Sequence, residues 1–436
     1  MDYSELFKSR ILTADEAAYK IQSGQRVFLT GNCSVPQKVL AALVDHAPEL
    51  HNVEICHALT VGPADYVSEE MDGHIRVNTM FISSNVRKAV HEGRADFTPV
   101  LLSEFPLLFK NKLLPVDVAL IHVSPPDEHG FCSLGIEVGL TKSPAESAKM
   151  IIAEVNQQMP RTLGDSFIHI SRIHHMVPVD YPLPELLMVE GNPDVKIKKI
   201  ASFIAELIPD GATLQLGIGA IPDAVLGYLY DKKDIGIHSE LFSDGVIDLV
   251  ESGVITNSRK NIHTGKITAG FILGSKRLYD WVDDNPLIEL HPTEYINDPF
   301  VIAQNDLQVA INSAIEVDLT GQICADSIGP KLYSGVGGQL DFIYGAARSK
   351  GGVPIIALPS TATLRDGTTV SRIVAMLNKG SGVVTTRNHI HYVVTEYGIA
   401  SLYGKTIRER TKSLISIAHP DFRELLTKEA ETLNYI

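Results

Sequence analysis

The stretch "RVFLTGNCSVPQKVLAAL", residues 26–43, decides the fold, because it returns as "ATLQLGIGAIPDAVLGYL" at residues 212–229. Shifted by 186 positions, the two copies share residues at the following sites: Gly31 and Gly217, Pro36 and Pro222, Val39 and Val225, Leu40 and Leu226. Each copy reads as a short apolar strand, a glycine turn and a helix with proline near its first turn, where the missing N–H is tolerated. A strand–turn–helix unit written twice predicts a chain made of two related halves.

Three further pairs of segments repeat in the same order. They are "VALIHVSPPDEHG" (118–130) with "VAINSAIEVDLTG" (309–321), "MIIAEV" (150–155) with "PIIALP" (354–359), and "HHMVPVDYP" (174–182) with "IHYVVTEYG" (390–398). Chance is a poor explanation for colinear repeats whose offsets grow slowly. We therefore predict two homologous α/β domains, residues 1–188 and 189–436, each with a mostly parallel sheet flanked by helices.

The composition is that of a soluble globular protein. The chain has 436 residues, of which 44% are hydrophobic, and its 38 basic and 52 acidic side chains give a net charge of −14. That charge disfavours nucleic-acid binding. The cysteines form no CxxC pair, so we expect neither a disulfide framework nor a zinc site; they are Cys33, Cys56, Cys132 and Cys324. With no secretory signal and no membrane-spanning apolar run, we expect a cytoplasmic protein without membrane partners.

A glutamate marks the segment "IGIHSELFSDGVIDLVESG", residues 235–253, at the point where an apolar strand stops. A buried carboxylate at that point costs free energy unless it has partners or a task. Aligning Ile55 with Ile237 places Ala58 opposite Glu240, so one half has a small inert residue where the other has a carboxylate. Glu240 is therefore a candidate catalytic residue, and the alternative is a glutamate favoured by a helix N-terminus.

Two glycine-rich turns accompany this glutamate. In "LQLGIGAIPDAV" (214–225), Gly217 and Gly219 allow backbone N–H groups to point at an anion or a developing oxyanion. In "YSGVGGQLDFIYGAARSKGGVPIIALPST" (333–361), further glycines allow close backbone approach, and two cations are candidates for phosphate contacts: Gly335, Gly337, Gly338, Arg348 and Lys350. The alternative for this second segment is a tight strand-to-helix connection with solvated basic residues.

Other chemistries fit the sequence poorly. Pro222 occupies the last position of a would-be GxGxxG, and no P-loop or GxSxG elbow is present. The spacing of His169, His174 and His175 is better explained by a strand end than by a zinc site. Asp127 and its acidic and histidine neighbours in "SPPDEHG" are predicted to lie in a solvated loop.

Five motifs in order resemble the acetyl-CoA hydrolase/transferase group of family I CoA-transferases: "LGIGAIPDAV", "IHSELFSDG", "AINSAIEVDLTGQ", "SGVGGQLDF" and "VVTEYGIASLYGKTIRER". The resemblance covers essentially the whole chain. It is nearest to the branch that acts on 4-hydroxybutyrate, and next to the branch that exchanges CoA between butyrate and acetate. Together the five motifs are highly specific, although none of them is specific alone.

The resemblance implies a ping-pong transfer of CoA between short-chain carboxylic acids through a glutamyl-CoA thioester. Glu240 is the implied nucleophile, and the implied oxyanion donors are backbone amides around Ile218 and from Gly338 to Leu340. Gln215 and Asn312 match positions that line the active site. The candidate contacts for CoA are Gln215, Leu216, Gly217, Ile218, Gly219, Ile315, Gly335, Gly337, Gly338, Arg348 and Lys350.

CoA and acyl-CoA enter this interpretation as substrates, with no permanently bound cofactor and no metal. A homodimer or larger homo-oligomer is expected. Two alternatives remain at this stage: an acyl-CoA hydrolase on the same scaffold, which resolves the thioester with water, and a CoA-binding protein without catalysis. The presence of Glu240 with both glycine turns argues against the second of these.

Overall fold

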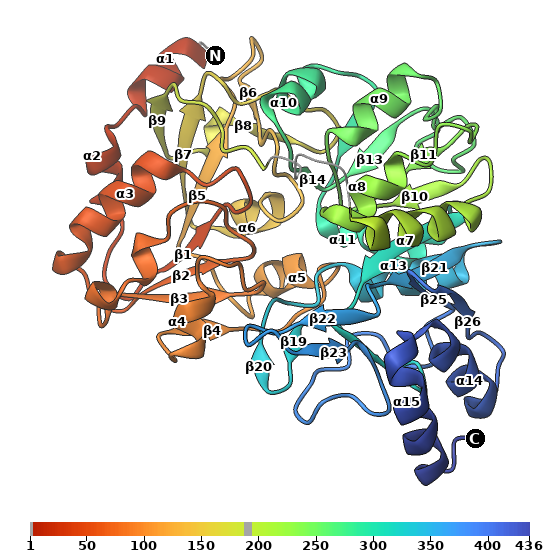
Figure 1. Ribbon diagram of the computed structural model, residues 1–436. Coiled ribbons are helices and arrows are strands. Elements are labelled where there is room, and N and C mark those ends of the chain that lie inside the picture. The colour runs from red at the N-terminus through yellow and green to blue at the C-terminus, as the bar shows by residue number, and fades with distance from the viewer. Residues whose placement is uncertain (1–2, 187–193) are drawn as a thin grey trace. The chain divides into compact units, whose positions relative to one another are not determined.

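The computed structural model describes residues 3–186 and 194–436 (Figure 1). Two compact units are present: one comprises Met1–Leu187 and Thr268–Ile296, and the other comprises Met188–Ile267 and Asn297–Ile436. The chain therefore enters the first unit twice. The domain boundary expected between residues 188 and 189 lies outside the described residues.

The first unit is built on a seven-stranded sheet whose paired strands all run parallel. In spatial order the strands are β4 (Ala95–Phe97), β3 (Ile75–Thr79), β2 (Val53–His57), β1 (Arg26–Leu29), β5 (Val118–Val123), β7 (Met150–Asn156) and β9 (His175–Val179). Every residue of β5 is buried, as expected for a central parallel strand covered on both faces.

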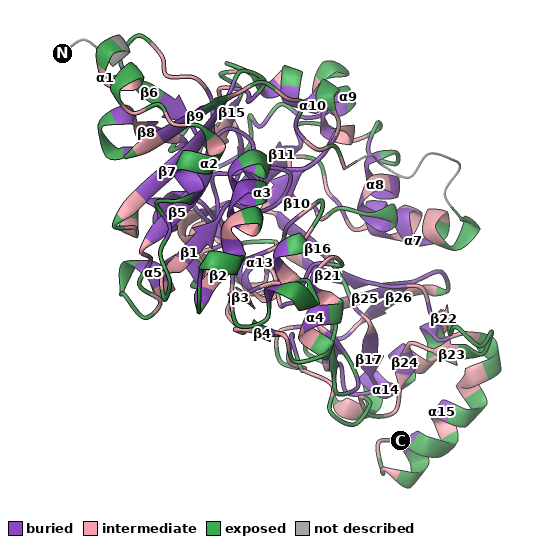
Figure 2. Ribbon diagram, turned by 90° about the vertical axis from the view of Figure 1, so that its left-hand side faces the viewer, coloured by how far each residue is buried: buried purple, intermediate pink, exposed green. Residues whose placement is uncertain are grey.

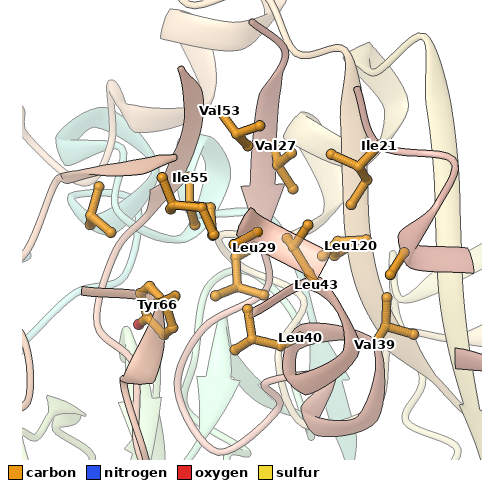
Figure 3. Packing of buried hydrophobic residues seen from close by; sticks show 14 of the residues in the cluster. Ile21, Val27, Leu29, Val39, Leu40, Leu43, Val53, Ile55, Tyr66 and Leu120 are labelled. Atoms are coloured by element: carbon orange, nitrogen blue, oxygen red, sulfur yellow. The ribbon is translucent and has the colours of Figure 1, made fainter. Parts of the chain in front are cut away.

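Helices and short strands complete this unit. The helices are α1 (Tyr3–Ser9), α2 (Ala14–Ala18), α3 (Gln37–His46), α4 (Arg87–His91), α5 (Phe105–Lys110), α6 (Lys142–Ser147), α10 (Lys276–Val282) and α11 (Thr293–Ile296), and the short strands are β6 (Phe131–Ser133), β8 (Phe167–His169), β14 (Phe271–Ile272) and β15 (Ile288–Leu290). Figure 3 shows Val27 and Leu29 of β1, Ile55 of β2 and Leu120 of β5 meeting Leu43 of α3 in the core.

The second unit has a six-stranded sheet that is parallel except for its last pair. Its spatial order is β11 (Gly236–Ile237), β10 (Thr213–Gln215), β16 (Gln308–Ser313), β21 (Val353–Ala357), β25 (Tyr392–Thr395) and β26 (Gly398–Ser401). Its helices are α7 (Val195–Glu206), α8 (Ala220–Leu226), α9 (Gly245–Glu251), α12 (Pro299–Ile302), α13 (Gln339–Arg348), α14 (Ile407–Ile417) and α15 (Pro420–Thr432). Figure 2 shows α15 largely exposed along its outer side and the sheet strands mostly buried.

Additional short strands of the second half lie between these elements. They are β12 (Leu241–Phe242), β17 (Glu316–Asp318), β18 (Ile323–Cys324), β19 (Ser327–Ile328), β20 (Lys331–Leu332), β22 (Thr361–Thr363), β23 (Thr369–Ser371) and β24 (Ile373–Val374), while β13 (Ile267–Ala269) carries the chain from the second unit into the first. Among the described residues, no helix is long and apolar enough to span a membrane.

The two sheets repeat the same strand order, which agrees with the duplication predicted from sequence. The order β2-β1-β5-β7-β9 in the first unit matches β11-β10-β16-β21-β25 in the second. The register corrects one detail of the alignment. Phe28 pairs with Cys56, and its counterpart Leu214 pairs with Ile237. Glu240 therefore corresponds to Leu59 rather than Ala58, because a strand of two residues leaves too little pattern to fix a sequence alignment.

Candidate active site

Glu240 follows β11 and lies against the end of β10. The Ser239 hydroxyl accepts a hydrogen bond from the Leu216 N–H at 3.1 Å and donates one to the Leu216 carbonyl at 3.0 Å. Leu216 also forms an antiparallel bridge with Leu241. Both neighbours of Glu240 are thus fixed to the residue that precedes the first glycine turn, so the glutamate is placed where a strand ends and a helix is about to begin.

Two groups bind the Glu240 carboxylate. The Asn297 side-chain amide donates to Oε2 at 3.1 Å, and the Gly338 backbone N–H donates as well. A methyl group built on Gly338 would lie 2.0 Å from the same oxygen, so a side chain at this position would displace the carboxylate. Gly338 immediately precedes the ten-residue helix α13, whose N-terminal dipole favours an anion there.

The pKa of the Glu240 carboxyl group lies near neutral pH. Burial of the carboxyl group raises its pKa to about 7, although the hydrogen bonds from Asn297 and Gly338 act in the opposite direction. The residue keeps part of its surface exposed. A desolvated carboxyl group that remains reachable and titrates near pH 7 is typical of a catalytic acid, base or nucleophile.

The structure brings Gln215 and Asn312 together at the ends of neighbouring strands. The Gln215 side-chain carbonyl accepts from the Ile311 N–H at 3.1 Å and from the Asn312 side-chain amide at 2.9 Å. Gln215 is buried and Asn312 is partly exposed. These two amides therefore support each other at the same edge of the sheet as Glu240, and their contact with substrate stays a prediction.

The second glycine turn is held by the side chain of Gln339. Its amide donates to the Ser313 carbonyl at 2.6 Å and its carbonyl accepts from Thr385 at 3.1 Å. Both bonds are internal to the protein, so Gln339 fixes the start of α13 instead of facing a ligand. Of the predicted site residues in this region, Gly335 and Gly338 are buried, while Gly337, Ile315 and Leu340, the last an expected oxyanion donor, are partly exposed.

The first glycine turn is open to solvent. Ile218 exposes 39% of its surface, unusually much for an isoleucine next to a buried strand. Gly219 follows with φ of 113° and nothing within 4 Å of a Cβ built there. Leu216 is buried and Gly217 is partly exposed. A turn with exposed backbone beside the end of a parallel strand suits ligand binding, and the role of Ile218 as an oxyanion donor stays a prediction.

Arg348 and Lys350 lie away from the glutamate. They stand at the C-terminal end of α13, about 15 Å from its start at the usual helical rise. The Arg348 guanidinium lies 5.4 Å from the ring centroids of Tyr344 and Phe300, and the Lys350 ammonium is 3.9 Å from Asp306. The structure does not bring these cations to Glu240, and their contact with CoA phosphates stays a prediction.

Asn297 is the residue that sequence reasoning missed. It directly follows α11, is fully buried, and its side-chain carbonyl has no hydrogen-bond partner. In sequence it stands 57 positions from Glu240 in "YINDPF", where Asp298 is the conventional helix cap. No motif distinguishes Asn297 from a second capping residue, so only the fold reveals its contact with the glutamate.

The structure also places the residues that were considered for other chemistries. All four cysteines are free and buried. Asp127 accepts from the backbone of His129 and Phe131, and pairs with Arg161 at 3.2 Å, so it organises a loop in which His129 is exposed. Glu128 and His129 approach each other at 3.5 Å with both side chains exposed, so the loop is solvated as predicted.

Comparisons with known proteins cover both halves of the chain. Residues 1–185 match the acetyl-CoA hydrolase/transferase N-terminal domain, and residues 274–430 match the acetyl-CoA hydrolase/transferase C-terminal domain.

Curated relatives and solved structures agree with these matches. The 4-hydroxybutyrate coenzyme A transferase of Clostridium kluyveri is 52% identical, over 98% of this chain and 99% of its own. The butyryl-CoA:acetate CoA-transferase of Anaerostipes caccae is 38% identical, over 99% of this chain and 98% of its own. The crystal structure of 4-hydroxybutyrate CoA-transferase from Porphyromonas gingivalis has a TM-score of 0.85 at 40% identity, with 99% and 100% of the two chains covered.

Proposed function

Because the chain belongs to the acetyl-CoA hydrolase/transferase family, we propose that it transfers CoA between short-chain carboxylic acids such as 4-hydroxybutyrate, butyrate and acetate. Relatives named as CoA-transferases that match along the full chain support this reaction class. The single observation that carries the site is the Glu240 carboxylate, held by Asn297 and by the N–H of Gly338 at the start of a helix.

The proposed reaction proceeds in covalent steps. The Glu240 carboxylate attacks the thioester carbonyl of acyl-CoA, which expels CoA thiolate and leaves an acyl-glutamyl anhydride. The thiolate then attacks the glutamyl carbonyl, releases the first carboxylate and forms a glutamyl-CoA thioester. A second carboxylate repeats these steps in reverse and leaves as the new acyl-CoA. Dividing the transfer in this way replaces one difficult step by several easier ones.

Backbone amides supply the stabilisation that a weak carboxylate nucleophile requires. The Gly338 N–H already contacts Glu240, and we propose that it stabilises the oxyanion when the glutamyl carbonyl is attacked. The exposed backbone at Ile218 is proposed for the second oxyanion. Removing one preorganised donor of this kind costs roughly 100- to 1000-fold in rate. The remainder of CoA, through contacts remote from the reacting bond, supplies binding energy that lowers the barrier.

The proposed CoA site extends from the first glycine turn along the second. We propose Gln215, Asn312 and Ile315 near the reacting end, and Arg348 with Lys350 for the phosphate groups. We further propose a homodimer or larger homo-oligomer that works in the cytoplasm. CoA is a substrate in this scheme, and no permanently bound cofactor takes part.

Mass spectrometry after incubation with butyryl-CoA and no acceptor acid tests the proposal. The expected result is an adduct of CoA mass that borohydride removes, present in the native protein and in Glu251→Ala, whose carboxylate is exposed on α9, and absent in Glu240→Ala. Retained acyl exchange in Glu240→Ala, without an adduct in the native protein, would contradict the role of Glu240. Release of free CoA without any added acid would instead identify a hydrolase.

A further inference from the structure

The strand that leads to Glu240 lies at the edge of its sheet and is unusually short. β11 has two residues and pairs with β10 on one side only. Its inner side is satisfied by backbone, because the Gly236 N–H donates to the Ala212 carbonyl and the His238 N–H to the Leu214 carbonyl. Between these two residues, the backbone groups of Ile237 point to the outer side, where an edge strand normally leaves them unpaired.

Two buried side chains occupy that outer side. The Asn257 side-chain carbonyl accepts from the Ile237 N–H at 2.8 Å, and the Lys260 ammonium donates to the Ile237 carbonyl at 2.8 Å. Asn257 and Lys260 each expose only 4% of their surface. Two residues earlier, on the same outer side, the Ile235 N–H still pairs with backbone, at the Val254 carbonyl. Pairing on the outer edge thus passes from main chain to side chain at Ile237.

The first half of the chain shows what these side chains replace. There the corresponding strand β2 pairs on its outer side with β3, which in turn pairs with β4. The second sheet ends at β11, so a loop of residues 257–266 takes the place of a further strand. This loop is itself fixed, because the Gly265 N–H donates to the Asn257 carbonyl and the Thr264 hydroxyl to the Lys260 carbonyl.

Burying the Lys260 ammonium group costs free energy. A buried ammonium must be compensated by hydrogen bonds, and Lys260 reaches both the Ile237 carbonyl and the Lys266 carbonyl, the latter at 2.6 Å. Its side chain crosses β11 where a Cβ on Gly236 would lie 2.7 Å from Lys260 Cγ. The absence of a side chain at Gly236 therefore leaves the space that the Lys260 side chain occupies.

We infer that Lys260, together with Asn257, is a positioning residue for Glu240. Ile237 stands three residues before the glutamate, and His238 and Ser239 between them are held to β10 and Leu216 as described above. The bonds from Asn257 and Lys260 to Ile237, here called the clamp, hold this backbone on its outer side, where the sheet ends. Lys260 does not touch substrate in this scheme; it fixes the backbone from which the nucleophile projects. The inference rests on the proposed function, since it assigns Lys260 a task in that reaction.

The substitution Lys260→Met removes the donor and keeps a buried chain of similar length. We expect kcat for CoA transfer from butyryl-CoA to acetate to fall by about 100-fold, as a misplacement near 1 Å at the nucleophile does. The KM for butyryl-CoA should change by less than about twofold, because substrate contacts remain. Adduct formation on Glu240 in a single turnover should slow by the same factor as kcat.

Thr395→Val is the matched control. The Thr395 hydroxyl is also buried and donates to a backbone carbonyl, that of Ile417 at 2.6 Å, but it lies on β25, toward the other edge of the sheet. This variant should lose stability and keep kcat. If Lys260→Met does not fold, Asn257→Gly tests the other half of the clamp, because glycine retains the left-handed backbone at φ of 57° and removes the acceptor.

The outcomes separate the two claims. A native protein that transfers CoA, with a Lys260→Met variant whose kcat matches that of Thr395→Val, would overturn the positioning role and leave the proposed function standing. A native protein without any glutamyl adduct would overturn the proposed function and this role together. A selective loss of kcat in Lys260→Met or Asn257→Gly supports the inference.

Discussion

The Cα of Gly338 lies so close to the Glu240 carboxylate that a Cβ at this position would come within 2.0 Å of Oε2 and within 2.5 Å of the Asn297 amide nitrogen. Gly338 has φ of −90°, which any residue can adopt, so the constraint on this position comes from contact with the carboxylate rather than from backbone conformation. The space at the N-terminus of α13 is thus filled by the Glu240 carboxylate and the Asn297 side-chain amide.

This contact predicts the effect of Gly338→Ala. The added methyl group must displace the glutamate or the asparagine, so the nucleophile leaves its position at the helix N-terminus. We expect CoA transfer to fall by at least about 100-fold, with a melting temperature close to that of the native protein because a side chain can move away. Steady-state kinetics beside a thermal melt check this. Full activity in the variant would mean that Glu240 is not held as the structure shows.

A second prediction concerns pH. Burial raises the pKa of Glu240 to about 7, and the nucleophile is the deprotonated form. The value of kcat/KM, which reports the free enzyme, should therefore fall about tenfold for each unit below pH 7 and level off above it. A profile measured from pH 5 to 9 with butyryl-CoA and acetate tests this. A flat profile between pH 5 and 7 would contradict a nucleophile with this pKa.

Asn297 should influence that profile. Its hydrogen bond stabilises the carboxylate and so acts to lower the pKa of Glu240. Asn297→Ala should move the ascending limb of kcat/KM to higher pH and reduce the plateau by about 10- to 100-fold, through loss of a donor beside the reacting group. Asn388→Ala, at an exposed asparagine of the same unit, is the control and should leave both unchanged. An unshifted limb in Asn297→Ala would show that this bond is absent in solution.

The raised pKa also has a consequence for stability. Because the folded-state pKa of Glu240 lies above its ordinary value of 4.5, folding favours the protonated form, and the stability associated with it is lost as pH rises toward 7. Glu240→Gln removes this titration. We expect the variant to melt at a higher temperature than the native protein at pH 8, with the difference shrinking as pH falls from 7 toward 4.5. Equal melting temperatures at pH 8 would argue against a desolvated carboxylate.

The proposed phosphate contacts are tested by comparing two substrates. The double variant Arg348→Ala with Lys350→Ala should raise the KM for butyryl-CoA and leave the KM for butyryl-pantetheine unchanged, because the truncated substrate lacks the phosphates. Equal effects on the two substrates would indicate a structural role, and no effect on either would remove these residues from the site. The aromatic contacts of Arg348 with Tyr344 and Phe300 make a melting curve of the variant a necessary control.

The sequence by itself predicted the duplication and the mostly parallel sheets, and it singled out Glu240 as a candidate. Repeated strand and turn patterns are local, so they survive in the sequence; the strand order that both sheets share agrees with the duplication they predicted. Sequence comparison reached its limit at β11. Because this strand has only two residues, the alignment of the two halves placed Glu240 one position away from its true counterpart. A short edge strand carries little periodicity, because its partners lie elsewhere in the chain.

Only the tertiary structure decided which groups surround Glu240. Asn297 and Lys260 occur in segments without a motif; folding brings Asn297 to the Glu240 carboxylate and Lys260 to the half-paired strand β11. It also separated Arg348 and Lys350 from the glutamate by the length of α13, although both follow the second glycine turn directly in sequence. Strands, turns and helices follow from local sequence patterns. The surroundings of the Glu240 carboxylate depend on packing, because the amides of Asn297 and Gly338 that bind it come from distant parts of the chain.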